Sequence, residues 1–405
     1  PLYQLKSGYS EQDPNDWVEK AIIAVNNIVT NDNIASDDIL GMSFSGQMHG
    51  LVLIDKQGDP IRNAILWNDT RTTAQCEFLM DTIGTELIQI AKNKALEGFT
   101  LPKILWVREN EKDLFSKTYK FLLPKDYLRY KLTGKLYTDY SDAAGTLLLD
   151  VANKKWSKEI LDKLSLPKEI CPALIESHEF AGTILKDMSK RMNLNENVKV
   201  YSGGADNSCG AVGAGILNNS TAMCSIGTSG VLLAYEEDKT KDFKVQVHFF
   251  NHSKSNSFYI MGVTLSAGYS LSWFKKTFCE NISFDELLAK IKKVPVGSNG
   301  LLFTPYIMGE RTPYADSKIR GSFIGLSASH NINDFTRSVI EGIVFSLRDS
   351  LEIIRNSQKE INNIISTCGG SKNDEWLQIQ SNIFNAKIIK LKNKQGTAMG
   401  SALIA

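Results

Sequence analysis

The chain begins a strand-rich pattern twice, and this repetition constrains its fold more than any other feature. The first pattern has predicted strands at 39–44, 51–54 and 64–66, and the second has them at 222–226, 231–234 and 258–263. Helices and strands alternate after each start, which is typical of α/β proteins. With 405 residues, the chain is longer than one hydrophobic core usually organises. We therefore predict two α/β domains, residues 1–216 and 217–405.

Local patterns place the other elements. Asp13 and Pro14 precede apolar residues at helical spacing, so a helix is predicted to follow them. The run 39–44 is predicted as a buried strand with 51–54 as its neighbour. The second half is predicted to contain helices near 265–278, 284–291, 333–354, 375–384 and after Gly396, and strands at 364–367 and 388–391.

Composition narrows the class of partner. Lys plus Arg number 46 against 45 Asp plus Glu, without long runs of one sign, which argues against a nucleic-acid or anionic-membrane surface. A small molecule is the expected partner. The apolar stretches are too short to span a bilayer, and the cytoplasm is the expected location. The cysteines are too few and too scattered for a disulfide framework and are predicted to be reduced core thiols.

The segment 203–207, Gly-Gly-Ala-Asp-Asn, follows a predicted strand at 198–201. Glycines ahead of an acid let the backbone approach a ligand and leave the carboxylate at a strand end. Asp206 is therefore a candidate general base that takes a proton from a hydroxyl attacking phosphorus. The alternative is an N-cap for the following helix.

Two other loops combine glycines with hydroxyl side chains. Ser225–Gly230 offers backbone N–H and hydroxyl donors to a phosphate, or is a plain hairpin turn. Cys368–Asn373 places glycines and a helix N-terminus after a strand, where open α/β sheets bind nucleotides. It matches neither GxxxxGK[ST] nor GxGxxG, and a left-handed turn is its alternative.

The remaining polar motifs are weaker. Gly46–Gly50 contains polar groups suited to a polyol, although a lone histidine such as His49 is more often structural. His248 and His252 lie in a strand-like stretch without a nearby acid or thiol, so a metal site there is disfavoured. Glu310–Pro313 is interpreted as a surface ion pair with a proline turn.

Taken in order, several segments resemble the FGGY carbohydrate kinases, and within them those that act on D-xylulose. The similar segments cover nearly the whole chain: 8–14 (GYSEQDP), 45–50 (SGQMHG), 65–72 (ILWNDTRT), 248–252 (HFFNH), 262–268 (GVTLSAG) and 309–313 (GERTP). The Met48-His49-Gly50 step is the most discriminating of them.

The resemblance implies two ribonuclease-H-like domains of the actin and sugar-kinase superfamily around a central cleft that holds the sugar and Mg-ATP. It implies transfer of the γ-phosphoryl group of ATP to D-xylulose, giving D-xylulose 5-phosphate, with Asp206 as the general base. The implied sugar-binding residues are Met48, His49, Asp206 and Asn207. The implied ATP-binding residues are Gly227, Thr228, Trp273, Gly369, Gly370 and Asn373, and no magnesium ligand is assigned.

The family pattern opens with a strand hairpin bearing an Asp-x-Gly-Thr phosphate loop, which would lie before Pro1, and continues after Ala405. We therefore expect a longer natural chain and a sheet edge near 39–44. One rival is an FGGY kinase for another polyol or sugar acid, such as glycerol or gluconate. The other is a sugar- or nucleotide-binding protein without turnover. The expected partners are a ketose and ATP, and a homodimer is left open.

Overall fold

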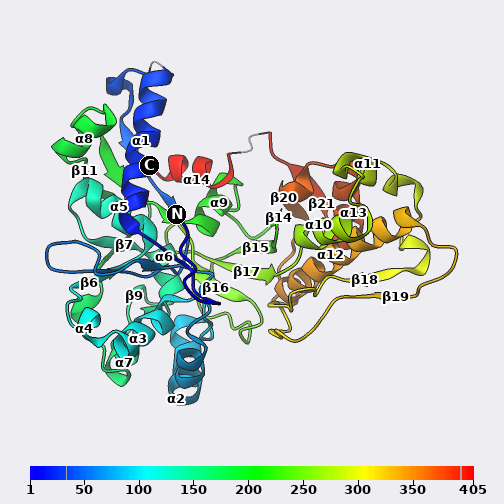
Figure 1. The fold of residues 1–405 in the computed structure, drawn as a ribbon, viewed down its shortest axis with the longest axis horizontal. Helices are drawn as coiled ribbons and strands as arrows, with labels where there is room; N and C mark the ends of the chain where they lie inside the picture. The colour runs from blue at the N-terminus through cyan, green and yellow to red at the C-terminus, as the bar shows by residue number, and fades with distance from the viewer. Residues whose placement is uncertain (33, 393–394) are drawn as a thin grey trace. The chain divides into compact units, whose positions relative to one another are not determined.

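The computed structural model describes residues 1–32, 34–392 and 395–405. These residues form two compact units. Unit 1 comprises Pro1–Gly213, Phe250–Phe258 and Gln395–Ala405, and unit 2 comprises Ala214–Phe249 and the described part of Tyr259–Lys394. The predicted α/β class is confirmed, with helices and strands alternating in both units (Figure 1). The predicted division at residues 216 and 217 stays a prediction.

The strands of unit 1 are short, and α1 (Pro14–Asn31) and α2 (Thr73–Ala91) are its longest helices. The helices and strands of this unit are β1 (Glu11–Gln12), α1 (Pro14–Asn31), β2 (Gly41–Met42), β3 (Ser45–Gly46), β4 (Val52–Ile54), β5 (Ala64–Ile65), α2 (Thr73–Ala91), α3 (Thr100–Asn110), α4 (Lys112–Phe115), β6 (Lys120–Leu122), α5 (Pro124–Thr133), β7 (Tyr137–Asp139), α6 (Tyr140–Ala143), β8 (Leu149–Asp150), β9 (Lys155–Trp156), α7 (Lys158–Lys163), β10 (Ala173–Ile175), β11 (Phe180–Thr183), α8 (Lys186–Met192), β12 (Lys199–Tyr201), β13 (Gly204–Ala205), α9 (Asp206–Gly213) and α14 (Gly396–Ile404).

The first helix shows how unit 1 builds its core. Asp13 caps α1 by accepting the N–H of Asn15, and Pro14 stands at the first helical position, as predicted. The buried face of α1 packs with α5 and with the strands around it. Its partners in the core include Val52, Tyr127 and Val200.

The segment 39–44 lies at a sheet edge, as expected, but it is not the buried strand beside 51–54 that was predicted. Only β2 is extended there, and Leu40 beside it is 77% exposed. The three-stranded sheet has the order β11-β12-β2, so β2 is bonded on one side only, with Gly41 exposed and Met42 half-buried against the core. The run 51–54 is not its neighbour, because β4 pairs antiparallel with β6. Apolar letters do not distinguish an edge strand from a central one.

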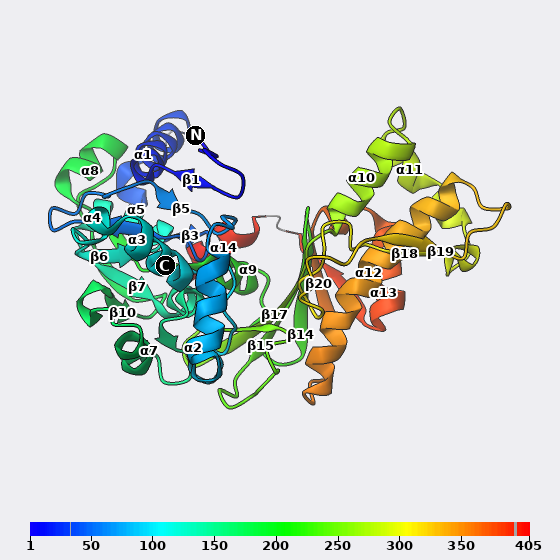
Figure 2. The same ribbon diagram turned by 60° about the horizontal axis from the view of Figure 1, so that its bottom comes forward.

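Unit 2 is organised around one sheet with the order β16-β17-β15-β14-β20-β21, of which the last residues of β16 and the first of β17 belong to unit 1. Its elements are β14 (Thr221–Ile226), β15 (Gly230–Glu236), β16 (His248–Asn251), β17 (Phe258–Thr264), α10 (Gly268–Phe278), α11 (Phe284–Ala289), β18 (Leu302–Thr304), β19 (Ser322–Ile324), α12 (Ile332–Asn356), β20 (Asn363–Cys368), α13 (Asp374–Phe384) and β21 (Lys387–Lys390). Figure 2 shows α12 and α13 on the same face of this sheet.

Long, strongly patterned elements of unit 2 match the predictions. The strands predicted at 222–226, 231–234 and 364–367 are β14, β15 and β20. The long predicted helix is α12, which begins at an Asn331–Asp334 capping box. The helix predicted from residue 265 begins only at Gly268, and before it the N–H of Leu265 donates to the Glu310 carboxylate at 3.0 Å.

The structure bears on two further expectations, the burial of the cysteines and the lack of membrane-spanning helices. Five cysteines are buried free thiols as predicted, but Cys368, the last residue of β20, is exposed. Among the described residues, none of the helices has the length and apolar content needed to cross a bilayer.

Candidate functional site

The predicted sugar-binding residues follow two neighbouring strands of unit 1. β3 and β13 pair in parallel, and their carboxyl ends lie at the same edge. Met48 and His49 follow β3, while Asp206 and Asn207 follow β13 directly. Ligands of open α/β sheets bind at this kind of edge. The structure brings the two pairs together, since the Asn207 side-chain amide lies 3.7 Å from the Met48 sulfur.

Asp206 is the first residue of α9, and its side chain is half-buried. One carboxylate oxygen accepts the backbone N–H of Asn207 at 2.7 Å and its side-chain amide at 3.0 Å. An N-cap aspartate instead accepts N–H groups two or three residues ahead, so this pattern does not favour the capping alternative.

Burial raises the pKa of Asp206 to about 6, against the opposing effect of the hydrogen bonds from Asn207. A carboxylate with this pKa is mostly ionised at neutral pH and is more basic than an exposed aspartate. These are the properties that a general base needs.

His49 is held by contacts on both its ring and its main chain. Its Nδ1 lies 2.8 Å from the carbonyl oxygen of Gly145, which assigns the proton to Nδ1 and makes Nε2 the acceptor of the ring. The ring packs on Phe99 with centroids 4.6 Å apart. The backbone of His49 is left-handed, with φ of 67°, a conformation that a non-glycine residue keeps only when its surroundings impose it.

Lys103 and Thr100, both on α3, bond the main chain of His49. The Lys103 ammonium donates to the His49 carbonyl at 3.0 Å, and the Thr100 hydroxyl donates to the same oxygen at 3.1 Å. Sequence reasoning missed both residues. The only signal was a lysine inside a helix whose neighbouring positions are apolar, which does not say what the lysine bonds.

Sequence analysis also missed a cluster of buried charged side chains that is linked to β13 by hydrogen bonds. Its members are Lys125, Asp126, Arg129, Asp139 and Asp142. The Lys125 ammonium is 2.7 Å from a carboxylate oxygen of Asp139, and Asp139 accepts the N–H and hydroxyl of Ser141. The Ser141 oxygen accepts the N–H of Ala205 at 3.0 Å. The cluster therefore anchors the residue that precedes the candidate base.

The charges of this cluster balance if one carboxyl is protonated. Burial raises the pKa of Asp142 well above its usual range although Lys125 is near, and Asp126 and Asp139 add to the rise. Burial alone would raise the pKa of Asp139, but Lys125 and the serine hydrogen bonds lower it by more, so the pKa of Asp139 is lowered. Two cations then face two carboxylates, as a buried network requires.

The two predicted phosphate loops in unit 2 have a parallel arrangement. β14 and β20 pair in parallel with Ile226 opposite Cys368. The loop after β14 contains Gly227 and Thr228, and the loop after β20 begins with Gly369. Both loops therefore leave the same edge of the sheet, at adjacent strands.

The loop after β14 is fixed by the start of α10. The N–H groups of Gly268 and Tyr269 donate to the carbonyls of Gly227 and Thr228 at 2.9 and 3.0 Å. Gly268 has no room for a side chain, since a Cβ would lie 2.4 Å from the Gly227 oxygen. Thr228 itself is exposed, so its hydroxyl is accessible to a ligand.

The loop after β20 is compact rather than a left-handed glycine turn. Its positive φ of 61° is at Cys368, not at Gly369 or Gly370. Gly370 is needed for packing, because a Cβ there would meet that of Ile226 at 2.7 Å. The Asn373 side chain accepts the N–H of Trp376 and caps α13.

Trp273 and Glu310, two other residues of unit 2 named by the sequence analysis, have defined partners within this unit. Trp273 stacks on Phe303 with centroids 6.5 Å apart, as part of an aromatic cluster. The interpretation of Glu310 in a surface ion pair is wrong, because it is buried and accepts the N–H groups of Leu265 and Arg311 at 3.0 and 2.7 Å. The Glu310 carboxylate satisfies these two backbone N–H groups, and burial raises the pKa of Glu310.

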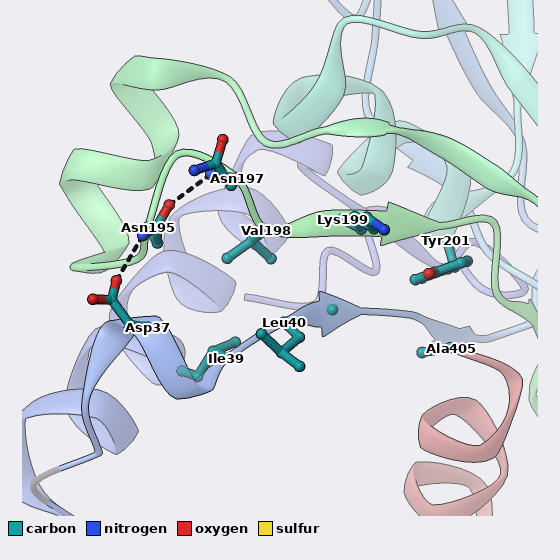
Figure 3. Close-up of a pocket in the computed structure, with 10 residues that line it drawn as sticks. Asp37, Ile39, Leu40, Asn195, Asn197, Val198, Lys199, Tyr201 and Ala405 are labelled. Atoms are coloured by element: carbon teal, nitrogen blue, oxygen red, sulfur yellow. Dashed lines mark hydrogen bonds between the residues drawn. The ribbon is translucent and has the colours of Figure 1, made fainter.

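A hollow of about 570 Å³ lies in unit 1 beside β2 and β12 (Figure 3). Its lining residues are Asp37, Ile39, Leu40, Gly41, Asn195, Asn197, Val198, Lys199, Tyr201 and Ala405. Apart from Ala405, which follows α14, they lie on or before β2 and β12, which precede β3 and β13 in the chain, and none is a predicted site residue. This hollow is therefore separate from the sugar-binding segments.

A resident metal centre finds little support in the side chains. Among residues 1–32, 34–392 and 395–405, His, Cys, Asp and Glu form no group of three that could hold an ion. His252 uses Nδ1 to accept the N–H of Lys254 at 2.9 Å. Magnesium bound to nucleotide phosphates needs few protein ligands, so it fits these residues better than a protein cage does.

Known proteins resemble the chain over its whole length. Residues 1–213 match the N-terminal domain of the FGGY family of carbohydrate kinases, and residues 222–405 match its C-terminal domain. The xylulose kinase of Bacillus subtilis is 56% identical over 405 residues, covering 100% of this chain and 81% of that protein.

Solved structures share the fold. A crystal structure of a xyloylose kinase from Brucella ovis superposes with a TM-score of 0.93 and 35% identity, covering 100% of this chain and 83% of that one. The gluconate kinase of Lactobacillus acidophilus also superposes with a TM-score of 0.93, at 26% identity, covering 100% of this chain and 82% of that one.

Proposed function

This chain belongs to the FGGY family of carbohydrate kinases, whose members phosphorylate a carbohydrate with ATP, and we propose that its acceptor is D-xylulose and its product D-xylulose 5-phosphate. The identity of 56% to the Bacillus subtilis xylulose kinase over the full chain supports this acceptor. The 26% identity to a gluconate kinase is much lower.

The observation that carries the proposal is the environment of Asp206. Its carboxylate lies at the carboxyl end of β13 and accepts the N–H of Asn207. Burial raises the pKa of Asp206 to about 6, which makes the carboxylate more basic. In the proposed reaction Asp206 accepts the proton of the terminal sugar hydroxyl at carbon five. The freed oxygen attacks the γ-phosphorus in line, and the bond to the β-phosphate oxygen breaks to release ADP.

The sugar-binding residues suit a neutral acceptor. His49 presents Nε2 as an acceptor for a sugar hydroxyl, while Asn207 supplies an amide, and Met48 supplies a buried apolar contact. None of these side chains is a cation. A sugar acid such as gluconate would favour a cation for its carboxylate.

The nucleotide is assigned to unit 2. We propose that Gly227 and Thr228 donate to the phosphates, and that the second loop, with Gly369, Gly370 and Asn373, lies around the nucleotide. Their departure from adjacent parallel strands supports a shared ligand. Trp273 stays a prediction as a nucleotide contact. Magnesium enters with ATP and neutralises phosphate charge when bound.

Gluconate is the second candidate acceptor, because the Lactobacillus acidophilus gluconate kinase has the same fold with a TM-score of 0.93. Fold similarity therefore does not choose between the acceptors. We further propose a cytoplasmic location, since ATP is supplied there. A homodimer stays a prediction.

A coupled assay of ADP release across pentuloses, polyols and sugar acids tests the proposal. The expected result is the highest kcat/KM with D-xylulose. A higher kcat/KM with gluconate or glycerol would assign another acceptor, and sugar-independent nucleotide binding without ADP release would favour a binding protein.

A further inference from the structure

The side chain of Lys103 is buried among apolar residues, an environment that normally excludes charged groups. It is fully buried on α3, where Leu101, Pro102, Ile104 and Leu105 are buried as well. The ion pairs formed by the described residues do not include it. Moving an ammonium group out of water is costly unless partners compensate. Burial lowers the pKa of Lys103 to about 7, against the opposing effect of Asp69.

The compensation comes from two backbone carbonyls. The Lys103 ammonium donates to the oxygen of His49 at 3.0 Å and to that of Gly98. It thereby joins the loop before α3 to the loop after β3. The Thr100 hydroxyl bonds the same His49 oxygen, so one helix supplies two donors to one carbonyl.

The bonded carbonyl belongs to the residue whose backbone most needs support. His49 has a left-handed φ of 67°, and a residue with a Cβ holds that conformation only under constraint. A pKa of about 7 leaves the ammonium form of Lys103 populated at neutral pH, and in that form its hydrogen bond to this carbonyl is stronger than one from a neutral donor. The His49 ring direction follows from the backbone that carries it.

We propose that Lys103 is a positioning residue of the sugar site, whose ammonium group fixes the main chain of His49 so that the imidazole faces the acceptor sugar. This inference rests on the proposed role of His49 in sugar binding. The alternative is that Lys103 only fills space between α3 and its neighbours.

The two roles predict different results for Lys103→Met, which keeps the length of the side chain and removes its donors. A positioning role predicts a sugar KM raised on the order of 10- to 100-fold, the loss expected for hydrogen bonds to a charged group. The KM for ATP stays within about twofold. The substitution removes the cost of a buried ammonium but leaves the Gly98 carbonyl without this donor, so the two effects oppose each other and Tm should change little.

Lys120→Met is the matched control. Lys120 is another lysine of unit 1 whose ammonium donates to two backbone carbonyls, those of Glu169 and Cys171 at 2.5 and 2.9 Å. It is on β6 and contacts none of the sugar-site residues through these bonds. Its substitution should leave the sugar KM at the wild-type value.

Hydrogen–deuterium exchange of the full chain supplies a measurement that does not need turnover. In Lys103→Met, the amides of residues 46–51 should exchange faster, while those of β13 and α9 stay as in the wild type. Lys120→Met should leave residues 46–51 unchanged.

The outcomes separate the two proposals. A wild-type chain that phosphorylates none of the sugars refutes the proposed function, and exchange then decides the role of Lys103 alone. Wild-type exchange at 46–51 in Lys103→Met overturns the inference. So does a variant with lowered Tm and equal rises in both KM values, which would assign Lys103 to packing.

Discussion

A methyl group added at Gly145 should displace the His49 ring in the proposed sugar site. A Cβ built at this position would lie 2.7 Å from His49 Nδ1, 2.9 Å from His49 Cε1 and 3.2 Å from Met48 Cε. Ordinary contact begins at 3.4 Å, so the ring must retreat by about 0.7 Å, the difference between 3.4 and 2.7. The carbonyl of Gly145 also accepts the Nδ1 proton, so this hydrogen bond is strained as well.

A displacement of about 1 Å in a positioning group costs on the order of 100-fold in rate. For Gly145→Ala we therefore expect kcat/KM for the sugar to fall about 10- to 100-fold, mostly through KM, with the KM for ATP unchanged. Overpacking should cost about 1–3 kcal/mol of unfolding free energy. Steady-state kinetics with each substrate varied in turn, and urea unfolding, measure these effects.

Gly84→Ala is the control, with the same added methyl group in unit 1. It lies within α2, and its Cβ would meet chiefly the flexible end of Met80 at 3.1 Å. Alanine is favoured over glycine in a helix by roughly 1 kcal/mol. This variant should keep wild-type kinetics. A Gly145→Ala enzyme with an unchanged sugar KM would refute the placement of His49 in the sugar site.

Two other predictions concern the charged cluster and the second phosphate loop. Asp142→Asn should change the unfolding free energy at pH 7 by less than about 1 kcal/mol, because charge balance with Lys125 and Arg129 assigns the proton of the cluster to the Asp142 carboxyl, which a neutral amide then replaces. Lys125→Met should cost about 3–5 kcal/mol, because Asp139 loses its cation while Asp126 keeps Arg129; equal losses in urea unfolding would contradict this charge assignment. Thiol titration of the native protein should give one fast-reacting cysteine, Cys368, and saturating ATP should slow it; an unprotected Cys368 would argue against nucleotide binding at this loop.

The sequence predicted the elements whose patterns are long and continuous. β14, β15, β20 and α12 match the expectation closely because their apolar runs are buried in one sheet and its covering helices. The sheet edge expected near 39–44 is β2, but its burial and its neighbour were mispredicted because pairing partners, not residue types, decide them.

The site was predicted unevenly for a physical reason. Asp206 and the glycine loops carry local motifs, so their placement at strand ends could be inferred from neighbouring residues. The roles of Met48 and His49 came from the family resemblance. Lys103 and Asp139 could not be found, because their partners lie far away in the sequence and only the fold brings them together.

The pH dependence of the sugar kcat/KM tests the assignment of Asp206 most directly. The base must be ionised to accept a proton, so a group whose pKa is raised to about 6 makes kcat/KM fall as the pH drops through 6, about tenfold per pH unit below it. Asp206→Asn should lower kcat by about 10²–10⁴-fold and remove this acid limb. It should not destabilise the protein at pH 7, because the raised pKa means that the ionised carboxylate itself opposes folding there. A wild-type limb at pH 6 that is lost in Asp206→Asn is the expected result, and an Asp206→Asn enzyme with near-normal turnover and the same limb would contradict the account.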